Sequence, residues 1–293
     1  MPYQIPKRII QTGKHHQQPL LNRAMMTSIR LLNPDYEYLF FDDVGVEEFI
    51  EREFPEYREL FHSFPFRIQR FDFFRYLAVY RYGGFYFDVD VMLASGVSDL
   101  LDYGCVFPFE GLTLNLYLRR QHNMDWELGN FAFGAAPEHP FIGALIKNCV
   151  RGQREPDWVA PMMRGFPPIF RSEYVVLNTT GPGAVSRTFA ENAALAKSVK
   201  VLFPKDIFDL NDWNCFGDYG VHLMDGSWRT QSGYARRRLA QRWENWKLAR
   251  VIEESRRLRN SNNKALLQHN ASHGSTAAVK VEEAVAIHRA EKR

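Results

Sequence analysis

"GGFYFDVDV", residues 83–91, combines a glycine pair, an apolar run and two aspartates. The glycines are typical of a turn, and the aromatic and β-branched residues after them predict a buried strand. Side chains alternate between the two faces of a strand, so Asp88 and Asp90 should point the same way. Two neighbouring carboxylates repel each other unless a cation or hydrogen-bond donors lie between them. The stretch therefore predicts a ligand site at the end of a strand.

A helix should precede this strand, over "RIQRFDFFRYLAVYRY" (67–82), and end at the glycine pair. Asp72 would lie about 15 Å from the end of the helix, and the aspartate pair about 10–17 Å along the strand. A helix folded back on the strand brings Asp72 and Arg75, which share a face, level with the pair. The alternative is an internal ion pair between Asp72 and Arg75, with the aspartate pair in a solvated turn.

The chemistry of such a cluster favours a metal ion. Ligands of α/β proteins bind beyond the carboxyl ends of the strands. Carboxylate oxygens are the ligands that Mg²⁺ and Mn²⁺ prefer, and these ions in turn hold phosphate oxygens. Three carboxylates and a guanidinium at this edge therefore predict a site for a metal and a diphosphate.

The rest of the pattern predicts an α/β protein. A strand at 7–12, a helix at 19–32 and a strand within 33–43 form the opening of a parallel sheet. Further strands are expected at 104–109, 113–118, 129–135 and 200–203, and further helices at 46–54, from 139 to about 150, and within 178–192. Residues 151–170, with four prolines and no periodicity, predict a long loop, which is either a lid or a plain surface loop. Residues 221–228 predict a polar loop.

The composition is that of a folded globular protein, since 45% of the 293 residues are hydrophobic and 14% aromatic. No run approaches the roughly 18–20 apolar residues of a membrane span, and the N-terminus does not resemble a signal peptide. The three cysteines have no metal-binding spacing, so reduced thiols are expected. We therefore expect a cytoplasmic protein, with the inner face of a membrane as a further location.

The net charge of +3 is unevenly distributed. Residues 229–259 hold 10 Lys/Arg against 3 Asp/Glu, whereas residues 1–228 carry a net −6. An acidic body argues against nucleic-acid binding. A basic helix is expected over 234–259, with Leu239, Trp243 and Trp246 on one face; it either contacts an anionic membrane or packs on the domain. Residues 260–293 are expected to be disordered.

Six stretches in this order carry a family resemblance: "IPKRIIQTG", "NPDYEYLFFDD", "RFDFFRYLAVYRYGGFYFDVDV", "NFAFGAAPEHPF", "TGPG" and "VHLMDGSW". Together they resemble the DxD-containing glycosyltransferases of family 32, which include fungal mannosyltransferases and bacterial capsule and lipopolysaccharide enzymes. The central block is also similar to that of clostridial glucosylating toxins. The resemblance implies a GT-A fold (a Rossmann-like α/β fold with a mixed, mostly parallel sheet) over residues 1–228. It also implies a nucleotide-diphosphate sugar donor, Mn²⁺ or Mg²⁺, and retention of the anomeric configuration.

The resemblance also implies roles for individual residues. Asp90 would ligate the metal, and Asp88 would contact the donor sugar or ribose while supporting the metal. Asp72 and Arg75 would bind sugar hydroxyls and the diphosphate, completing the catalytic set. The implied donor-binding residues are Gln11, Thr12, Asp72, Arg75, Tyr86, Asp88, Asn130, Ser227 and Trp228, and the implied metal ligands are Asp88, Asp90 and His222.

Two departures leave the base of the donor open. The tryptophan that often follows Gln11 in relatives is missing, and Ile10 replaces a histidine. Both uridine and guanosine therefore remain candidates for the nucleoside of the donor. The acceptor is expected to be a glycan or a glycolipid. The alternatives are a sugar-nucleotide hydrolase or nucleotidyltransferase on the same metal, and a non-catalytic protein that binds sugar nucleotides or carbohydrates. The former lacks a glycine-rich phosphate loop near the N-terminus, and the complete carboxylate set disfavours the latter.

Overall fold

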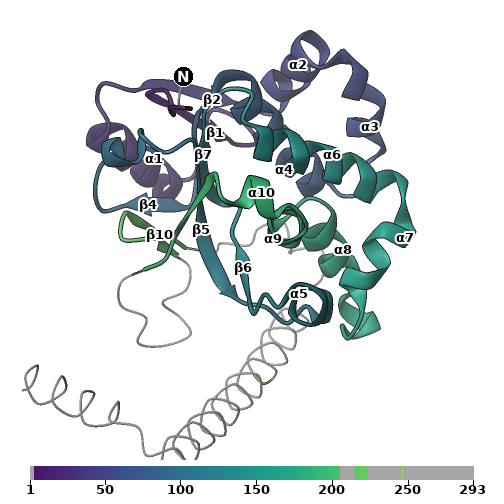
Figure 1. The fold of residues 1–293 in the computed structure, drawn as a ribbon. Helices are drawn as coiled ribbons and strands as arrows, with labels where there is room; N and C mark the ends of the chain where they lie inside the picture. Colours follow the sequence, from purple (N-terminus) through teal and green to yellow (C-terminus); the bar gives the residue numbers. More distant parts are fainter. Residues whose placement is uncertain (1–2, 205–214, 224–245, 247–293) are drawn as a thin grey trace, which may run out of the picture. The chain divides into compact units, whose positions relative to one another are not determined.

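The computed structural model describes residues 3–204, 215–223 and 246 (Figure 1). The chain divides into two compact units, residues 1–237 and 238–293, and every described residue except 246 lies in the first. The expected domain boundary at 228, the tail and all of the basic helix but residue 246 fall outside the described residues, so these expectations stay predictions. No helix in the described part of the chain combines the length and the apolar character needed to cross a bilayer.

In the described part of the chain, ten strands form two sheets. The strands are β1 (Arg8–Thr12), β2 (Glu37–Phe41), β3 (Gly84–Phe87), β4 (Val91–Leu93), β5 (Cys105–Leu112), β6 (Trp126–Leu128), β7 (Ala132–Ala135), β8 (Val199–Leu202), β9 (Cys215–Phe216) and β10 (Gly220–His222). Seven strands make a mixed sheet in the order β2-β1-β3-β7-β5-β6, with β8 paired to β5. The pairs β1–β2, β1–β3 and β5–β8 are parallel. The small sheet has the order β4-β10-β9.

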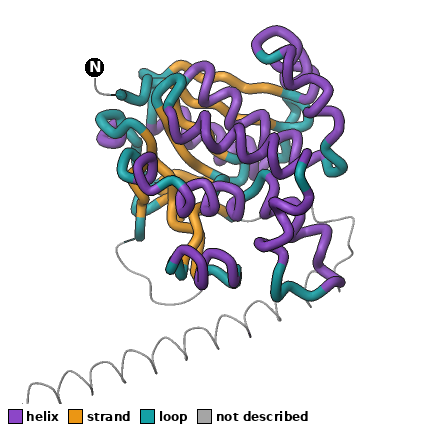
Figure 2. Tube along the Cα trace, turned by 45° about the vertical axis from the view of Figure 1, so that its right-hand side comes forward, coloured by secondary structure: helices purple, strands orange, loops and turns teal. Residues whose placement is uncertain are grey.

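The helices surround the large sheet (Figure 2). They are α1 (Leu20–Leu32), α2 (Asp43–Glu53), α3 (Arg58–Ser63), α4 (Arg67–Tyr82), α5 (Leu116–His122), α6 (Pro140–Arg154), α7 (Pro156–Val159), α8 (Arg171–Thr179), α9 (Pro182–Glu191) and α10 (Ala193–Ala196), with 3₁₀ turns at Pro55–Tyr57, Ser98–Leu100, Ala160–Met163 and Pro168–Phe170. The predicted α/β class, a mixed central sheet flanked by helices, is confirmed.

Alternation along the strands separates two apolar cores. Ile10 and Tyr86 belong to the core that α2, α4, α6 and α9 cover. Ile9, Phe85 and Phe87 point to the opposite face, where α1 and the small sheet cover them. The result is three layers, with helices on one side of the sheet and α1 and the small sheet on the other (Figure 1).

The connection from α4 to β3 confirms the predicted helix end. Gly83 has a φ of +65° and its N–H donates to the carbonyl of Val79 at 2.8 Å. Gly84 has a φ of +108°, and a Cβ there would meet the carbonyl oxygen of Arg8 at 2.6 Å. Glycine is needed at both positions because L side chains avoid this backbone region. The chain therefore reverses within two residues, and α4 lies back along β3 as predicted.

Three predicted segments were wrong. Residues 113–118 are not a strand, because the Asn115 side chain accepts the N–H of Tyr117 at 2.9 Å and starts α5. Residues 151–170 are not a loop: they complete α6 and form α7 and two 3₁₀ turns, since prolines at the first helical positions start such turns. Residues 221 and 222 lie in β10 rather than in a loop. Strands β6 and β9 and helices α3, α8 and α10 were not predicted.

Candidate metal centre

The two aspartates lie in a turn between the two sheets. Strand β3 ends at Phe87, the N–H of Asp88 donates to the carbonyl of Phe131 at 2.7 Å, and the N–H of Val91 closes the turn on the carbonyl of Asp88 at 3.1 Å. The premise that Asp88 and Asp90 alternate along one strand was therefore wrong. Their carboxylates approach each other because the turn folds them together, where the chain passes from the large sheet to the small one.

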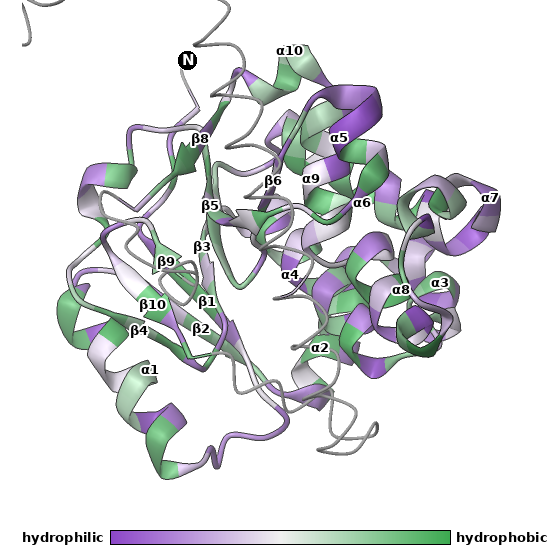
Figure 3. Cartoon of the chain, turned by 90° about the horizontal axis from the view of Figure 1, so that it is seen from below, coloured by the Kyte–Doolittle hydropathy of each residue, from purple (hydrophilic) through white to green (hydrophobic). Residues whose placement is uncertain are grey.

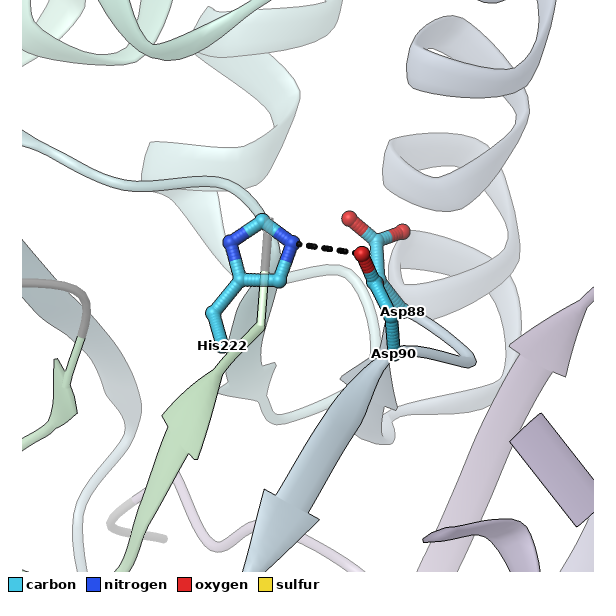
Figure 4. A group of neighbouring side chains, drawn as sticks. All are labelled: Asp88, Asp90 and His222. Carbon is cyan, nitrogen blue, oxygen red and sulfur yellow. Dashed lines mark ion pairs between the residues drawn. The ribbon is translucent and has the colours of Figure 1, made fainter. Parts of the chain in front are cut away.

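His222 completes the cluster. Strand β10 runs antiparallel to β4, so His222 is opposite Val91 and its ring lies beside Asp90. The Nε2 atom of His222 is 3.2 Å from an Asp90 carboxylate oxygen (Figure 4). The ring also stacks on Phe131, with centroids 4.5 Å apart. The pairing of two short strands thus positions the imidazole.

The three side chains form one group of ligand atoms. One atom each from Asp88, Asp90 and His222 lies within 4.8 Å of the others. Burial lowers the pKa of His222, but the hydrogen bond to Asp90 and the charges of both aspartates outweigh it, so the net pKa is raised. Among the described residues this is the group that could hold a metal ion.

Arg75 lies behind the cluster in the buried layer. Its Nη2 atom is 3.2 Å from Asp72 and 3.3 Å from Asp88, and its Nη1 atom donates to the carbonyl of Asn130 at 2.8 Å. The guanidinium also lies over the Tyr86 ring, 4.7 Å from its centroid. Since its side chain is only 4% exposed, Arg75 neutralises the buried Asp72 and the partly exposed Asp88 from a position where water screens its charge little.

Asp72 is held by donors from distant parts of the chain. One carboxylate oxygen accepts from Asn130 at 3.1 Å, and the other accepts from the Thr180 hydroxyl at 3.0 Å. The Asn130 amide also donates to the Tyr76 hydroxyl at 3.0 Å. Burial raises the pKa of Asp72 to about 6, against the opposing effect of Arg75. Asp72 therefore fixes the position of Arg75 and Asn130 beneath the aspartate turn.

The predicted donor-binding residues of β1 and β3 support the same turn. The Tyr86 hydroxyl donates to Asp88 at 2.8 Å and lies 3.0 Å from the Thr12 hydroxyl. Burial holds the pKa of Tyr86 well above its usual range, so this hydroxyl stays protonated. The Gln11 amide is 3.4 Å from the carbonyl of Asp88, and its oxygen accepts from Tyr38 at 2.8 Å. These contacts orient the Asp88 carboxylate.

The structure brings together every predicted site residue that it describes, and Ser227 and Trp228 lie outside the described residues. The residues brought together are Gln11, Thr12, Asp72, Arg75, Tyr86, Asp88, Asp90, Asn130 and His222. Their roles toward a donor stay predictions. Sequence reasoning did not single out Tyr76, Phe131 or Thr180. The one available signal was for Thr180, which begins the "TGPG" stretch.

Comparison with known proteins points to the same region. Residues 21–106 match the family described as "Glycosyltransferase sugar-binding region containing DXD motif". Inositol phosphoceramide mannosyltransferase 3 of Schizosaccharomyces pombe is 33% identical over 147 residues, covering 50% of this chain and 38% of that protein. Inositol phosphoceramide mannosyltransferase 2 of the same yeast is 27% identical over 247 residues, covering 80% of this chain and 63% of that protein.

The likeness to solved structures is more distant. The "PaToxG Glycosyltransferase" superposes with a TM-score of 0.44 at 16% identity, covering 67% of this chain and 76% of that one. The chain spans less than two thirds of the length of each yeast relative. The resemblance predicted from the sequence is confirmed for the central region. Residues 21–106, which hold Asp72, Arg75 and the aspartate turn, thus match the sugar-binding region of the DXD-containing glycosyltransferases, and the chain is similar to fungal inositol phosphoceramide mannosyltransferases.

Proposed function

We propose that this chain is a metal-dependent, retaining glycosyltransferase that moves a hexose from a nucleotide-diphosphate sugar to a glycan or glycolipid. The observation that carries the proposal is the convergence of Asp88, Asp90 and His222 at the end of β3, with ligand atoms within 4.8 Å of one another. The relatives are mannosyltransferases of inositol phosphoceramide by name, so mannose and a glycolipid are the first sugar and acceptor to test.

The cluster suits a divalent cation. Two carboxylates supply hard oxygen atoms and His222 a nitrogen, a donor set that Mn²⁺ accepts readily and Mg²⁺ accepts through its oxygens. Asp88, Asp90 and His222 would hold the ion. When bound, the ion would supply positive charge beside the diphosphate, where negative charge develops as the sugar leaves.

The protein's own groups would fix the donor. Arg75 and Asp72 would keep Asp88 in one orientation and face the donor sugar and diphosphate. The Nε atom of Arg75 is buried and has no hydrogen-bond partner among the described residues, so the remaining contacts of the guanidinium are those that hold Asp72, Asp88 and the carbonyl of Asn130. Ser227 and Trp228, which follow β10, are proposed to close over the diphosphate, as loops do that exclude water from a reaction. Residues 1–228 would form the catalytic domain.

A donor panel tests the proposal. The purified chain is incubated with UDP- and GDP-linked hexoses, including mannose, with Mn²⁺ and a lipid extract as acceptor. The release of nucleoside diphosphate and the labelled lipid product are then measured. We expect one donor to be used, turnover to stop in excess chelator, and NMR of the product to show the anomeric configuration of the donor.

Matched variants locate the activity. Asp90→Asn removes one charge at constant size and should abolish turnover, whereas Asp157→Asn, at an exposed position of α7, should keep it. Full turnover in excess chelator would falsify the metal-dependent mechanism. Donor binding without release of nucleoside diphosphate, with every donor and acceptor, would identify the chain as a binding protein instead.

A further inference from the structure

Helix α1 carries an exposed stripe that no described element covers. Leu20, Ala24, Thr27 and Leu31 recur at positions i, i+4, i+7 and i+11 and are all exposed, with Leu20 at 76% and Leu31 at 73%. The opposite face of the helix is buried in the core beneath β4. Single exposed leucines are common on protein surfaces, but two on one stripe at both ends of a helix are a feature that calls for a partner.

The same segment is purely cationic. Residues 13–34 contain no Asp or Glu, although residues 1–228 as a whole carry a net −6. Lys14, Arg23 and Arg30 are exposed, and among the described residues none forms an ion pair with them. Arg23 and Arg30 are seven residues apart and therefore flank the stripe on one side. We call the surface formed by Lys14, Leu20, Arg23, Arg30 and Leu31 the α1 face.

Helix α1 is connected to the candidate metal centre through β4 and through the segment that follows β1. Helix α1 packs against β4, and β4 begins at the residue after Asp90. The segment 13–19 connects α1 to Thr12, which contacts Tyr86 beneath the aspartate turn. Figures 1 and 3 both show α1 at the outer margin of the fold, beside β4. Figure 3 also shows apolar and polar residues alternating along α1.

We propose that the α1 face docks on an anionic lipid surface. Lipid phosphates would pair with Lys14, Arg23 and Arg30, while Leu20 and Leu31 would enter the headgroup region, as in interfacial amphipathic helices. Charge disfavours two other candidates for covering the face. Residues 229–259 carry a net +7, and a second copy would present the same positive face, so both would be repelled.

Docking would hold the aspartate turn near the membrane, behind α1, because the helix packs on β4 with the face opposite the exposed stripe. A glycolipid acceptor would then meet the site by diffusion within the bilayer, without leaving it. Only this use in transfer rests on the proposed function, since the docking itself rests on the exposure and charge of the α1 face.

Vesicle flotation of the full-length chain tests the proposal. We expect binding to vesicles of phosphatidylcholine mixed with phosphatidylserine, weaker binding at high salt, and none to phosphatidylcholine alone. Arg23→Gln/Arg30→Gln should lower the partition coefficient about thirtyfold, at about 1 kcal/mol for each arginine near the surface. Leu20→Ser/Leu31→Ser should lower it about tenfold or more, because both side chains lose their apolar contact.

A control variant tests whether the loss of binding is specific to the α1 face, and three outcomes would contradict the proposal. Lys147→Gln/Arg154→Gln removes the same charge from exposed positions of α6 and should bind as the unaltered chain does. The proposal is overturned if the unaltered chain stays unbound at low salt, or if the α1 variants bind as it does. A change of the α1 variants from dimer to monomer, with vesicle binding unchanged, would show that a second copy covers the face.

Donor turnover without lipid separates this proposal from the proposed function. The α1 variants should release nucleoside diphosphate at the unaltered rate, because none of the changed residues contacts the metal centre. A chain that binds anionic vesicles through the α1 face but uses no donor would refute the proposed function and leave the docking intact.

Discussion

Removing Arg75 should destabilise the protein far more than removing the charge of its partner Asp72. The two side chains are 4% and 5% exposed, and their closest charged atoms are 3.2 Å apart. Coulomb attraction at that distance is about 5 kcal/mol at an effective dielectric constant of about 20. Arg75→Met leaves both Asp72 and Asp88 without their cation, so the free energy of unfolding should fall by about 3–5 kcal/mol.

Asp72→Asn should cost only about 1 kcal/mol, because the guanidinium stays paired. Arg75 keeps Asp88 at 3.3 Å and the carbonyl of Asn130 at 2.8 Å, and asparagine keeps the shape of the side chain and most of its hydrogen bonds. In the double variant, the loss of Arg75 no longer strands a charge at position 72. The losses in free energy of unfolding of the two single variants should therefore sum to about 2 kcal/mol more than the loss measured for the double variant.

Urea unfolding at pH 7.5 measures the four free energies, with turnover recorded on the folded protein. Arg187→Met is a matched control, since Arg187 is also a buried arginine, paired with Glu191 at 2.6 Å in α9. It should lower stability by a similar amount and leave turnover of the folded fraction unchanged, whereas Arg75→Met should abolish turnover. Equal costs for Arg75→Met and Asp72→Asn, or strictly additive costs, would refute the idea that Arg75 serves both carboxylates.

Three further predictions concern separate parts of the fold. Asp90→Asn should weaken Mn²⁺ binding by about a hundredfold or more, which calorimetry measures; unchanged affinity would remove Asp90 from the metal centre. Burial lowers the pKa of His139 to about 4, so the folded state favours the neutral imidazole. The stability that this preference contributes is fully present above the unfolded pKa of about 6.5. It is lost as pH falls toward 4, by up to about 3 kcal/mol. His139→Asn, which keeps an acceptor for the first turn of α6, should flatten this part of the urea-unfolding profile, and an unchanged slope would contradict the assignment. Gly84→Ala should cost about 2 kcal/mol or more, because the added Cβ meets the carbonyl oxygen of Arg8 at 2.6 Å and φ is +108°; a smaller change in the unfolding midpoint than that of an exposed-surface variant would count against it.

The local part of the site was predictable from the sequence. The glycine pair forces a reversal within two residues, so simple helix and strand lengths were enough to bring Asp72 and Arg75 level with the aspartates. The strand itself was predicted too long: β3 ends at Phe87, because the N–H of Asp88 pairs with the carbonyl of Phe131 in a turn. Local propensity does not show such a contact, which depends on a segment more than forty residues away.

The remainder of the site depends on contacts between distant segments. Thr180 reaches Asp72 across 108 residues, and the "TGPG" stretch that it begins indicates a turn but does not show that its hydroxyl is a buried donor. The mistaken strand at 113–118 has a similar origin. The alternating leucines of this segment are compatible with a strand as well as a helix. The helix forms because the Asn115 side chain caps the N-terminus of α5. The amide of Asn115 also donates to the carbonyl of Met162 at 2.9 Å.

The sharing of one guanidinium between two carboxylates also has an evolutionary consequence. Loss of Arg75 leaves Asp72 and Asp88 without their shared cation and is costly for folding, whereas replacement of either carboxylate alone leaves the guanidinium paired with the other. Asp88, Asp90 and His222 are the more accessible residues, with side chains 24%, 14% and 16% exposed, against 5% for Asp72 and 4% for Arg75. A descendant that abandons catalysis should therefore lose Asp90 and His222 before the buried Arg75, so Arg75 by itself records ancestry, and Asp90 and His222 record present activity.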